Sequence, residues 1–228
     1  MTVTIVTALY GRYDVPRAQV EQDVDTQWLL YTDDRDLRPP APWQVVIERA
    51  WHPDPRRAAK HRKMCPPHLT DDVIWVDANM QVTARTFARE ALASRHDGIA
   101  LFRHPRRDDI YDEAAASVGA ESQGGKYDGE PIWEQVEHYR AEGHPPHSGL
   151  WAGGTIAWHL PEAASIGHAW QSEVERWSTQ DQLSLPVVLR RAGVRPGVFP
   201  VRQIEGRGPG FLHNRWLRIH GHHPVPVA

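Results

Sequence analysis

The residues Val73-Ile74-Trp75-Val76 form a short run in which every side chain is apolar. Such a run, bounded by polar residues, is typical of a strand covered on both faces, as in the parallel sheet of an α/β protein. The run ends at Asp77-Ala78-Asn79, where two side chains carry oxygen atoms. Because ligands of open α/β sheets bind beyond the carboxyl ends of the strands, the sequence predicts a site at that edge.

Further strand-like and helix-like segments alternate around this run. β-Branched and aromatic residues predict strands at residues 2–7, 28–32, 43–48, 98–102 and 153–158. Helical patterns cover about 55–65, 110–120, 131–142, 162–177 and 180–192, and another helix is expected from Thr83. We therefore expect one α/β domain with right-handed crossovers. The segment from Gly206 on is rich in Gly, His, Arg and Pro, and its final residues are expected to be mobile.

The composition bounds the class of protein. With 40% hydrophobic and 24% charged residues, the chain of 228 residues is typical of a globular protein. A net charge of −3 gives no general attraction to nucleic acid or to an anionic membrane. The one cysteine, Cys65, cannot form an intrachain disulfide, and no apolar run approaches the roughly 20 residues that span a bilayer. We therefore expect a cytoplasmic protein without a membrane span.

Several familiar catalytic motifs are missing from the sequence. It contains no HExxH, paired CxxC, G-x-S-x-G or P-loop pattern. Zinc proteases, zinc fingers, serine hydrolases and P-loop kinases thereby lose their main sequence support.

Asp77 and Asn79 are the sharpest candidates for a metal site. Two oxygen-bearing side chains one residue apart can face one hard divalent cation, which keeps some waters and takes diphosphate oxygens. The alternative is structural: Asp77 caps the helix expected near Thr83, or it is a turn residue.

A row of cations precedes this motif. Arg56, Lys60 and Lys63 stand at i, i+4 and i+7, so they share one face of the expected helix. Such a row can meet a diphosphate, and the alternative is a solvated basic face. Further along, Asp181-Gln182 opens another helix, where an acid also suits the helix dipole without any catalytic role.

In this order along the chain, the segments resemble a known family. It comprises the proteins catalogued as domain of unknown function 616, which are regarded as GT-A-type glycosyltransferases and are related in pattern to glycosyltransferase family 8. The resemblance implies a GT-A-like, Rossmann-type mixed sheet, with a nucleotide-binding half at about 1–105 and an acceptor and catalytic half at about 106–228. The matching stretches are residues 7–14, 31–34, 60–63, 66–68, 74–79, 104–107, 111–113, 139–143, 149–154 and 181–186.

The resemblance also implies roles for individual residues. Asp77 and Asn79 would correspond to the D-x-D motif that binds Mn²⁺ or Mg²⁺, although Asn79 brings one negative charge fewer. His220, or else His213, would be the third metal ligand. The nucleotide and its diphosphate would be held by residues of the first half: Thr7, Ala8, Tyr10, Asp33, Lys60 and Lys63.

Later residues would serve the donor sugar. Gly153 and Gly154 would let the backbone approach the sugar closely. Asp181 and Gln182 resemble the D-Q motif of family 8, which lies near the reacting carbon. The remaining polar candidates are either part of the acceptor region or a structural ion-pair network: His104, Arg107 and Glu113.

The predicted activity is metal-dependent transfer of a hexose from a nucleoside-diphosphate sugar, a UDP-sugar in the first place, to a hydroxyl acceptor such as a glycan. Retention of configuration is implied by the family 8 resemblance alone. One alternative is a non-catalytic nucleotide-sugar or carbohydrate-binding module. Another is glycosyl transfer to a modified DNA base, with arginines on the phosphates: Arg103, Arg106 and Arg107, or Arg56 and Arg57.

Overall fold

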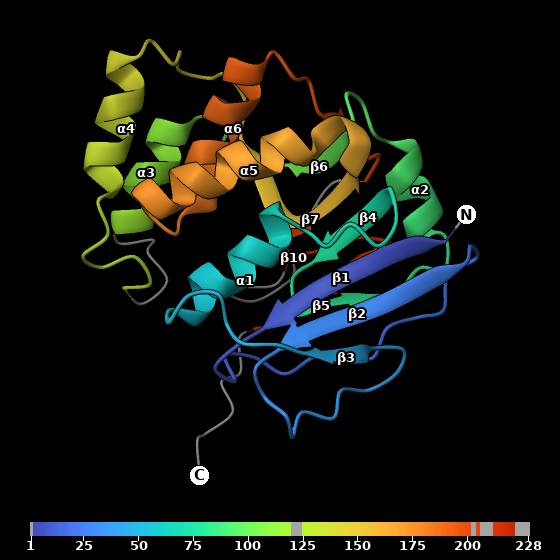
Figure 1. Ribbon diagram of the computed structural model, residues 1–228. Helices are drawn as coiled ribbons and strands as arrows, with labels where there is room; N and C mark the ends of the chain where they lie inside the picture. Colours follow the sequence, from blue (N-terminus) through green and yellow to red (C-terminus); the bar gives the residue numbers. More distant parts are fainter. Residues whose placement is uncertain (1, 120–124, 202–203, 206–211, 222–228) are drawn as a thin grey trace.

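The computed structural model describes residues 2–119, 125–201, 204–205 and 212–221. Its main sheet has seven strands in the order β3-β2-β1-β4-β7-β6-β8 (Figure 1). These strands are β1 (Val3–Leu9), β2 (Thr26–Thr32), β3 (Gln44–Ile47), β4 (Asp72–Val76), β6 (Ile99–Arg103), β7 (Trp151–His159) and β8 (Gly197–Val198).

Strand β7 makes the sheet mixed. β1 pairs in parallel with β2 and with β4, whereas β7 runs antiparallel to both β4 and β6. The first half of β7 therefore lies at the edge where β4 ends, and the main-chain nitrogen of Asp77 donates to the carbonyl of Gly154 at 2.8 Å. The predicted mixed α/β sheet is confirmed.

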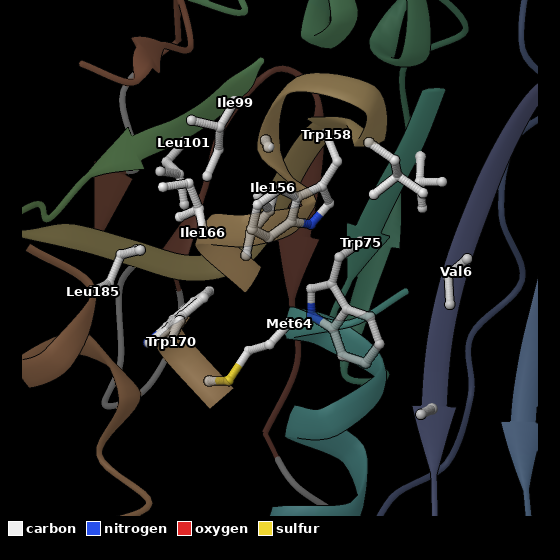
Figure 2. Close-up of a cluster of buried hydrophobic side chains, with 14 of the residues drawn as sticks. Val6, Met64, Trp75, Ile99, Leu101, Ile156, Trp158, Ile166, Trp170 and Leu185 are labelled. Carbon is white, nitrogen blue, oxygen red and sulfur yellow. The ribbon is translucent and has the colours of Figure 1, made fainter. Parts of the chain in front are cut away.

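The helices flank this sheet on both faces (Figure 1). Apolar side chains between the sheet and one helical layer include Trp75, Trp158, Met64 and Trp170 (Figure 2). That layer consists of α1 (Pro55–Met64), α5 (Leu160–Arg176) and α6 (Asp181–Ala192). The opposite face is covered by α2 (Phe87–Ala93), while α3 (Ile110–Val118) and α4 (Ile132–Ala141) pack beside α6. In the described part of the chain, no helix is both long and apolar enough to cross a membrane.

Helix α1 is fixed at both ends. The side chain of Asp54 caps it by accepting from the main-chain nitrogen of Arg56 at 2.8 Å. At its other end, the carbonyl of Met64 lies against Gly167 of α5, where a Cβ atom would come within 1.9 Å of that oxygen. Only glycine permits this approach, which braces α1 on α5.

A second, smaller sheet has the order β5-β11-β10-β9. The sequence predicted no strand in these segments. Trp216, which precedes β11, is fully buried, with its ring centroid 5.7 Å from that of Phe87 and 5.4 Å from that of Phe199. The strands are β5 (Met80–Val82), β9 (Ile204–Glu205), β10 (Leu212–His213) and β11 (Leu217–Ile219).

Two expectations about the elements need correction. No helix lies between β1 and β2 or between β2 and β3, so strands and helices do not alternate strictly in the first hundred residues. Helix α2 begins at Phe87 rather than near Thr83. Asp77 therefore does not cap it, and the capping alternative for Asp77 is wrong.

Candidate active site

A cavity opens where β1 and β4 end, beside α1. Its walls come from the loop after β1, from one face of α1 and from the turn Asp77-Ala78-Asn79 after β4. Lys126 and Thr179, from the second half of the chain, complete it. The predicted site at this edge of the sheet thus coincides with a cavity. Residues from both halves of the chain form its lining.

All three lysines of the sequence line this cavity. Lys60 and Lys63 project from α1 together with Arg56, so the cationic row faces the cavity rather than open solvent. Lys126 adds a further cation from the loop that precedes α4. With Asp14 and Asp77 as the acidic lining residues, the cavity has an excess of positive charge and suits an anionic ligand.

Asp181 links two of these lysines. Its carboxylate lies 2.9 Å from the Nζ atom of Lys60 and 2.6 Å from that of Lys63. The residues that line the cavity do not include Asp181 or Gln182. Gln182 is half-buried on the first turn of α6. Asp181 is therefore placed to hold the lysines, and contact of either residue with a sugar stays a prediction.

The charges in this cluster shift one another. Burial acts to raise the pKa of Asp181, but the two lysines outweigh it and lower that pKa well below its usual range. Burial disfavours the ammonium form of Lys63, but Asp181 and Asp77 outweigh it, and the pKa of Lys63 is raised. For Lys60 burial prevails, and its pKa is lowered to about 8.

Lys126 was not among the site residues predicted from the sequence. The guanidinium of Arg56 donates to the carbonyl of Lys126 and lies 3.2 Å from Glu130. The hydroxyl of Tyr127 donates to Gln180 at 3.1 Å. These contacts tie residues 125–130 to α1 and to the segment before α6. The sequence did hold one hint of its role: Lys126 is the only lysine outside α1.

The segment before α6 is a buried polar connection. The hydroxyl of Thr179 donates to Glu130 at 2.5 Å, and the side-chain nitrogen of Gln180 donates to Glu113 at 2.8 Å. Glu113 also accepts from Arg107 at 2.6 Å. Glu113 and Arg107 therefore support the segment that carries Asp181, which is the structural role considered for them.

His104 belongs to the same network. Its Nδ1 atom accepts from the main-chain nitrogen of Arg107 at 3.0 Å. Burial lowers the pKa of His104 to about 4, and the neighbouring arginines add to this shift. The imidazole is thus neutral at ordinary pH, and its 3.6 Å approach to Glu113 is not an ion pair.

The proposed metal-binding residues occupy one wall of the cavity. Asp77 and Asn79 both line it, and the Oδ1 atom of Asp77 accepts from the indole nitrogen of Trp75 at 2.6 Å. The side-chain nitrogen of Asn79 donates to the carbonyl of His220 at 3.0 Å. The backbone of His220 thus lies beside Asn79, whereas its imidazole Nε2 atom lies 3.2 Å from the side-chain oxygen of Gln81, and its role as a metal ligand stays a prediction.

This set of donors fits Mg²⁺ or Mn²⁺ only in part. No group of three or more His, Cys, Asp or Glu side chains converges within the ranges that the structure describes. A carboxylate and an amide oxygen suffice where a diphosphate and waters supply the remaining ligands. The side chain of His213 lies outside the described residues.

Gly153 and Gly154 make room for protein atoms. A Cβ atom on Gly153 would lie 2.9 Å from the Nζ atom of Lys63. On Gly154 it would lie 2.1 Å from the terminal methyl of Met80 and 3.2 Å from a carboxylate oxygen of Asp77. The two glycines thus let the cation and the carboxylate reach the cavity, while direct approach to a sugar stays a prediction.

The predicted nucleotide residues divide into two groups. Ala8 and Tyr10 line the cavity, and the hydroxyl of Tyr10 donates to Glu48. Thr7 is fully buried within β1 and is not among the lining residues. Asp33 is exposed at the end of β2 and accepts from the main-chain nitrogen of Gly11 at 3.1 Å, so it steadies the loop after β1.

The arginines named for a nucleic-acid partner make contacts within the protein. Arg56 is held as described above, and Arg57 donates to the carbonyl of Trp177 at 3.1 Å. The guanidinium of Arg103 lies 5.6 Å from the ring centroid of Trp151. These side chains thus contact other parts of the protein, and their contact with nucleic-acid phosphates stays a prediction.

Residues 41–201 match the model of a protein family, the TOD1/MUCI70 glycosyltransferase-like domain. The chain belongs to this family. The TOD1/MUCI70 match contains Lys60, Lys63, Asp77, Lys126 and Asp181, whereas the loop after β1 and the strands β10 and β11 lie outside it. The relation to domain of unknown function 616 and to glycosyltransferase family 8 stays a prediction.

The chain is also similar to a curated protein, the "Probable hexosyltransferase MUCI70" of Arabidopsis thaliana. The two are 27% identical over 161 residues, which is 64% of this chain and 27% of that protein. The chain therefore spans little more than a quarter of the length of this relative.

Proposed function

We propose that the protein transfers a hexose from a nucleoside-diphosphate sugar, in the first place a UDP-sugar, to a hydroxyl group of a glycan or another acceptor. The observation that carries this proposal is the cavity at the ends of β1 and β4, which is lined by all three lysines, two of them paired with the buried carboxylate of Asp181. Because the chain belongs to the TOD1/MUCI70 glycosyltransferase-like family, we take the anion that binds here to be the diphosphate of a sugar donor.

In the proposed reaction, the bond between the anomeric carbon and the diphosphate oxygen breaks, and its electron pair leaves with the diphosphate. The acceptor oxygen bonds to the anomeric carbon, and its proton passes to the departing diphosphate. Negative charge grows on the leaving group, so cations placed beforehand in a partly buried cavity lower the barrier. Lys60, Lys63, Lys126 and Arg56 supply that charge, and Asp181 keeps two of the lysines oriented. Retention of configuration is part of the proposal and rests on the family 8 resemblance.

Asp77 and Asn79 would hold Mn²⁺ or Mg²⁺ together with the diphosphate. The ion would add positive charge against the leaving group. Asn79 lowers the negative charge of the donor set, so the affinity for the ion should depend on the nucleotide more than in a site with two carboxylates.

The first experiment is hydrolysis and transfer from a panel of UDP- and GDP-sugars with Mn²⁺, comparing the wild type with Asp77→Ala. Loss of one charged ligand should lower turnover by a factor of about 100. Asp71→Ala is the matched control, because Asp71 is exposed before the opposite end of the same strand. Wild-type donor binding and turnover in Asp77→Ala would refute the metal assignment.

The alternative of a non-catalytic nucleotide-sugar-binding module predicts a different result. Nucleotide and donor should then bind with the same dependence on the lysines, but no donor should be hydrolysed or transferred. Measuring donor binding and donor consumption on the same preparation separates the two functions.

A further inference from the structure

Asn79 makes two hydrogen bonds with His220, which belongs to the C-terminal segment, residues 214–221. The main-chain nitrogen of His220 donates to the carbonyl of Asn79 at 2.9 Å, and the side-chain nitrogen of Asn79 donates back to the carbonyl of His220 at 3.0 Å. Asn79 is 8% exposed and lines the cavity. His220, the first residue beyond β11, is therefore fastened directly to the cavity wall.

These two bonds extend the pairing of β5 with β11. In that antiparallel pair, Leu217 lies opposite Val82 and Ile219 lies opposite Met80. The next pair outward is His220 opposite Asn79. In a regular antiparallel pair, residues that exchange two bonds use the main-chain donor and acceptor of each. Here the side-chain amide of Asn79 supplies the second donor.

The segment is anchored at its other end by Trp216. The main-chain nitrogen of Thr83 donates to the carbonyl of Trp216 at 2.8 Å, and the indole nitrogen of Trp216 donates to Glu90 at 2.9 Å. The stretch from Trp216 to His220 is thus held at both ends. Its attachment at the cavity depends on Asn79.

We propose that Asn79 is a positioning residue that holds the C-terminal segment at the rim of the cavity through the donor group of its amide. An aspartate could not take this place, because a carboxylate has no donor and would face the carbonyl of His220. The amide in the D-x-N motif therefore has a role of its own. This attachment does not depend on the proposed reaction, since it joins two parts of the same chain.

The test is backbone hydrogen exchange of residues 214–221 in the full chain without nucleotide, with a chelator present. Asn79→Asp should speed exchange of the His220 amide roughly tenfold, because a hydrogen bond is lost and a carbonyl is left without its donor. Asn79→Ala removes the donor without adding charge and should give a similar increase. It also carries the test if Asn79→Asp fails to fold.

Asn214→Asp is the matched control. The side-chain oxygen of Asn214 accepts from the main-chain nitrogens of Trp216 and Leu217 at 2.8 and 2.9 Å. A carboxylate can accept both bonds, so this variant makes the same chemical change in the same segment and should leave the exchange of His220 unaltered. Wild-type exchange in both Asn79 variants would overturn the proposal, and so would equal acceleration in Asn214→Asp.

Two further measurements separate this role from a general loss of structure and from metal binding. The midpoint of thermal unfolding should change little in Asn79→Ala, since the affected segment opens locally. If the loss of global stability in Asn79→Ala were as large as the free energy that corresponds to the faster exchange, the effect would be global unfolding, and the proposal would fail. Affinity for Mn²⁺ with UDP should be kept or increased in Asn79→Asp, which adds a carboxylate ligand, while its C-terminal exchange is faster. If wild-type protein binds no UDP, the proposed function fails, but the exchange comparison still decides the role of Asn79.

Discussion

At the scale of single residues, the site is organised around Asp181. One buried carboxylate holds the ammonium groups of Lys60 and Lys63 at 2.9 and 2.6 Å. Removing one member of a buried charge cluster leaves the others without compensation. The two lysines differ in their pKa values: the pKa of Lys63 is raised, whereas that of Lys60 is lowered to about 8.

The lowered pKa of Lys60 predicts proton uptake when a diphosphate binds. In the free protein Lys60 loses its proton as the pH rises through about 8. A bound diphosphate favours the ammonium form and raises this pKa, so binding takes up a proton above pH 8 and the affinity falls as the pH rises further. Titration calorimetry with UDP at pH 8.5, in two buffers of different ionisation enthalpy, measures the uptake.

Lys60→Met is the variant that checks this assignment. It should bind UDP more weakly, by about tenfold, and without the proton uptake, because a charge-assisted contact is removed. Equal proton uptake in wild type and Lys60→Met would assign the effect to another group.

Gly153→Ala should weaken UDP binding through Lys63. The new Cβ atom would lie 2.9 Å from the Nζ atom of Lys63, so the ammonium group must move from its place. A loss of about tenfold in affinity is expected. In a Lys63→Ala background the same substitution should add little, and an additive loss in this double-mutant cycle would contradict the explanation.

At the scale of elements, the sequence predicted the strands and helices whose residues show a clear local pattern. The apolar run of β4, the cationic face of α1 and the helix opened by Asp181 all form close to their expected bounds. β11 and Trp216 were missed, because a strand of three residues has too little periodicity to read and Trp216 is buried by partners far away in sequence. Lys126 was missed because its place depends on contacts between segments far apart in sequence, from its own carbonyl to Arg56 of α1 and from the adjacent Tyr127 to Gln180.

The burial of Trp216 predicts that the C-terminal strands are part of the core. Trp216→Ala should lower the free energy of unfolding by about 3–5 kcal/mol, the range for a large aromatic side chain in a packed core. Trp133→Ala is the control, because Trp133 is 50% exposed on α4, and its effect should stay within about 0.5 kcal/mol. Urea unfolding of both variants measures the difference, and similar values would show that the segment contributes little.

At the scale of the whole molecule, the site exists only when both halves of the chain are folded together. Lys60 and Lys63 come from α1, whereas Lys126, Thr179 and Asp181 come from the second half. The sequence could place these residues on their elements, but the distances between them arise from packing across the fold.

Because all three lysines line one cavity, amine chemistry should report on its occupancy. An N-hydroxysuccinimide ester at pH 8 should acylate Lys60 faster than Lys63, because the pKa of Lys60 is lowered to about 8 whereas that of Lys63 is raised. UDP with Mn²⁺ at ten times its dissociation constant should slow this labelling about tenfold. Peptide mass spectrometry gives the rate for each lysine, with the α-amine of the chain as an internal reference. Equal labelling with and without nucleotide would place the nucleotide elsewhere.

The pairing of the lysines with Asp181 also bears on how the protein withstands reducing sugars. An open-chain sugar aldehyde condenses with a neutral amine to form an imine, but it does not react in this way with an ammonium ion. By favouring the ammonium form of Lys63, Asp181 protects this side chain against glycation. Lys60 keeps a neutral fraction near pH 8, so such damage should reach Lys60 before Lys63.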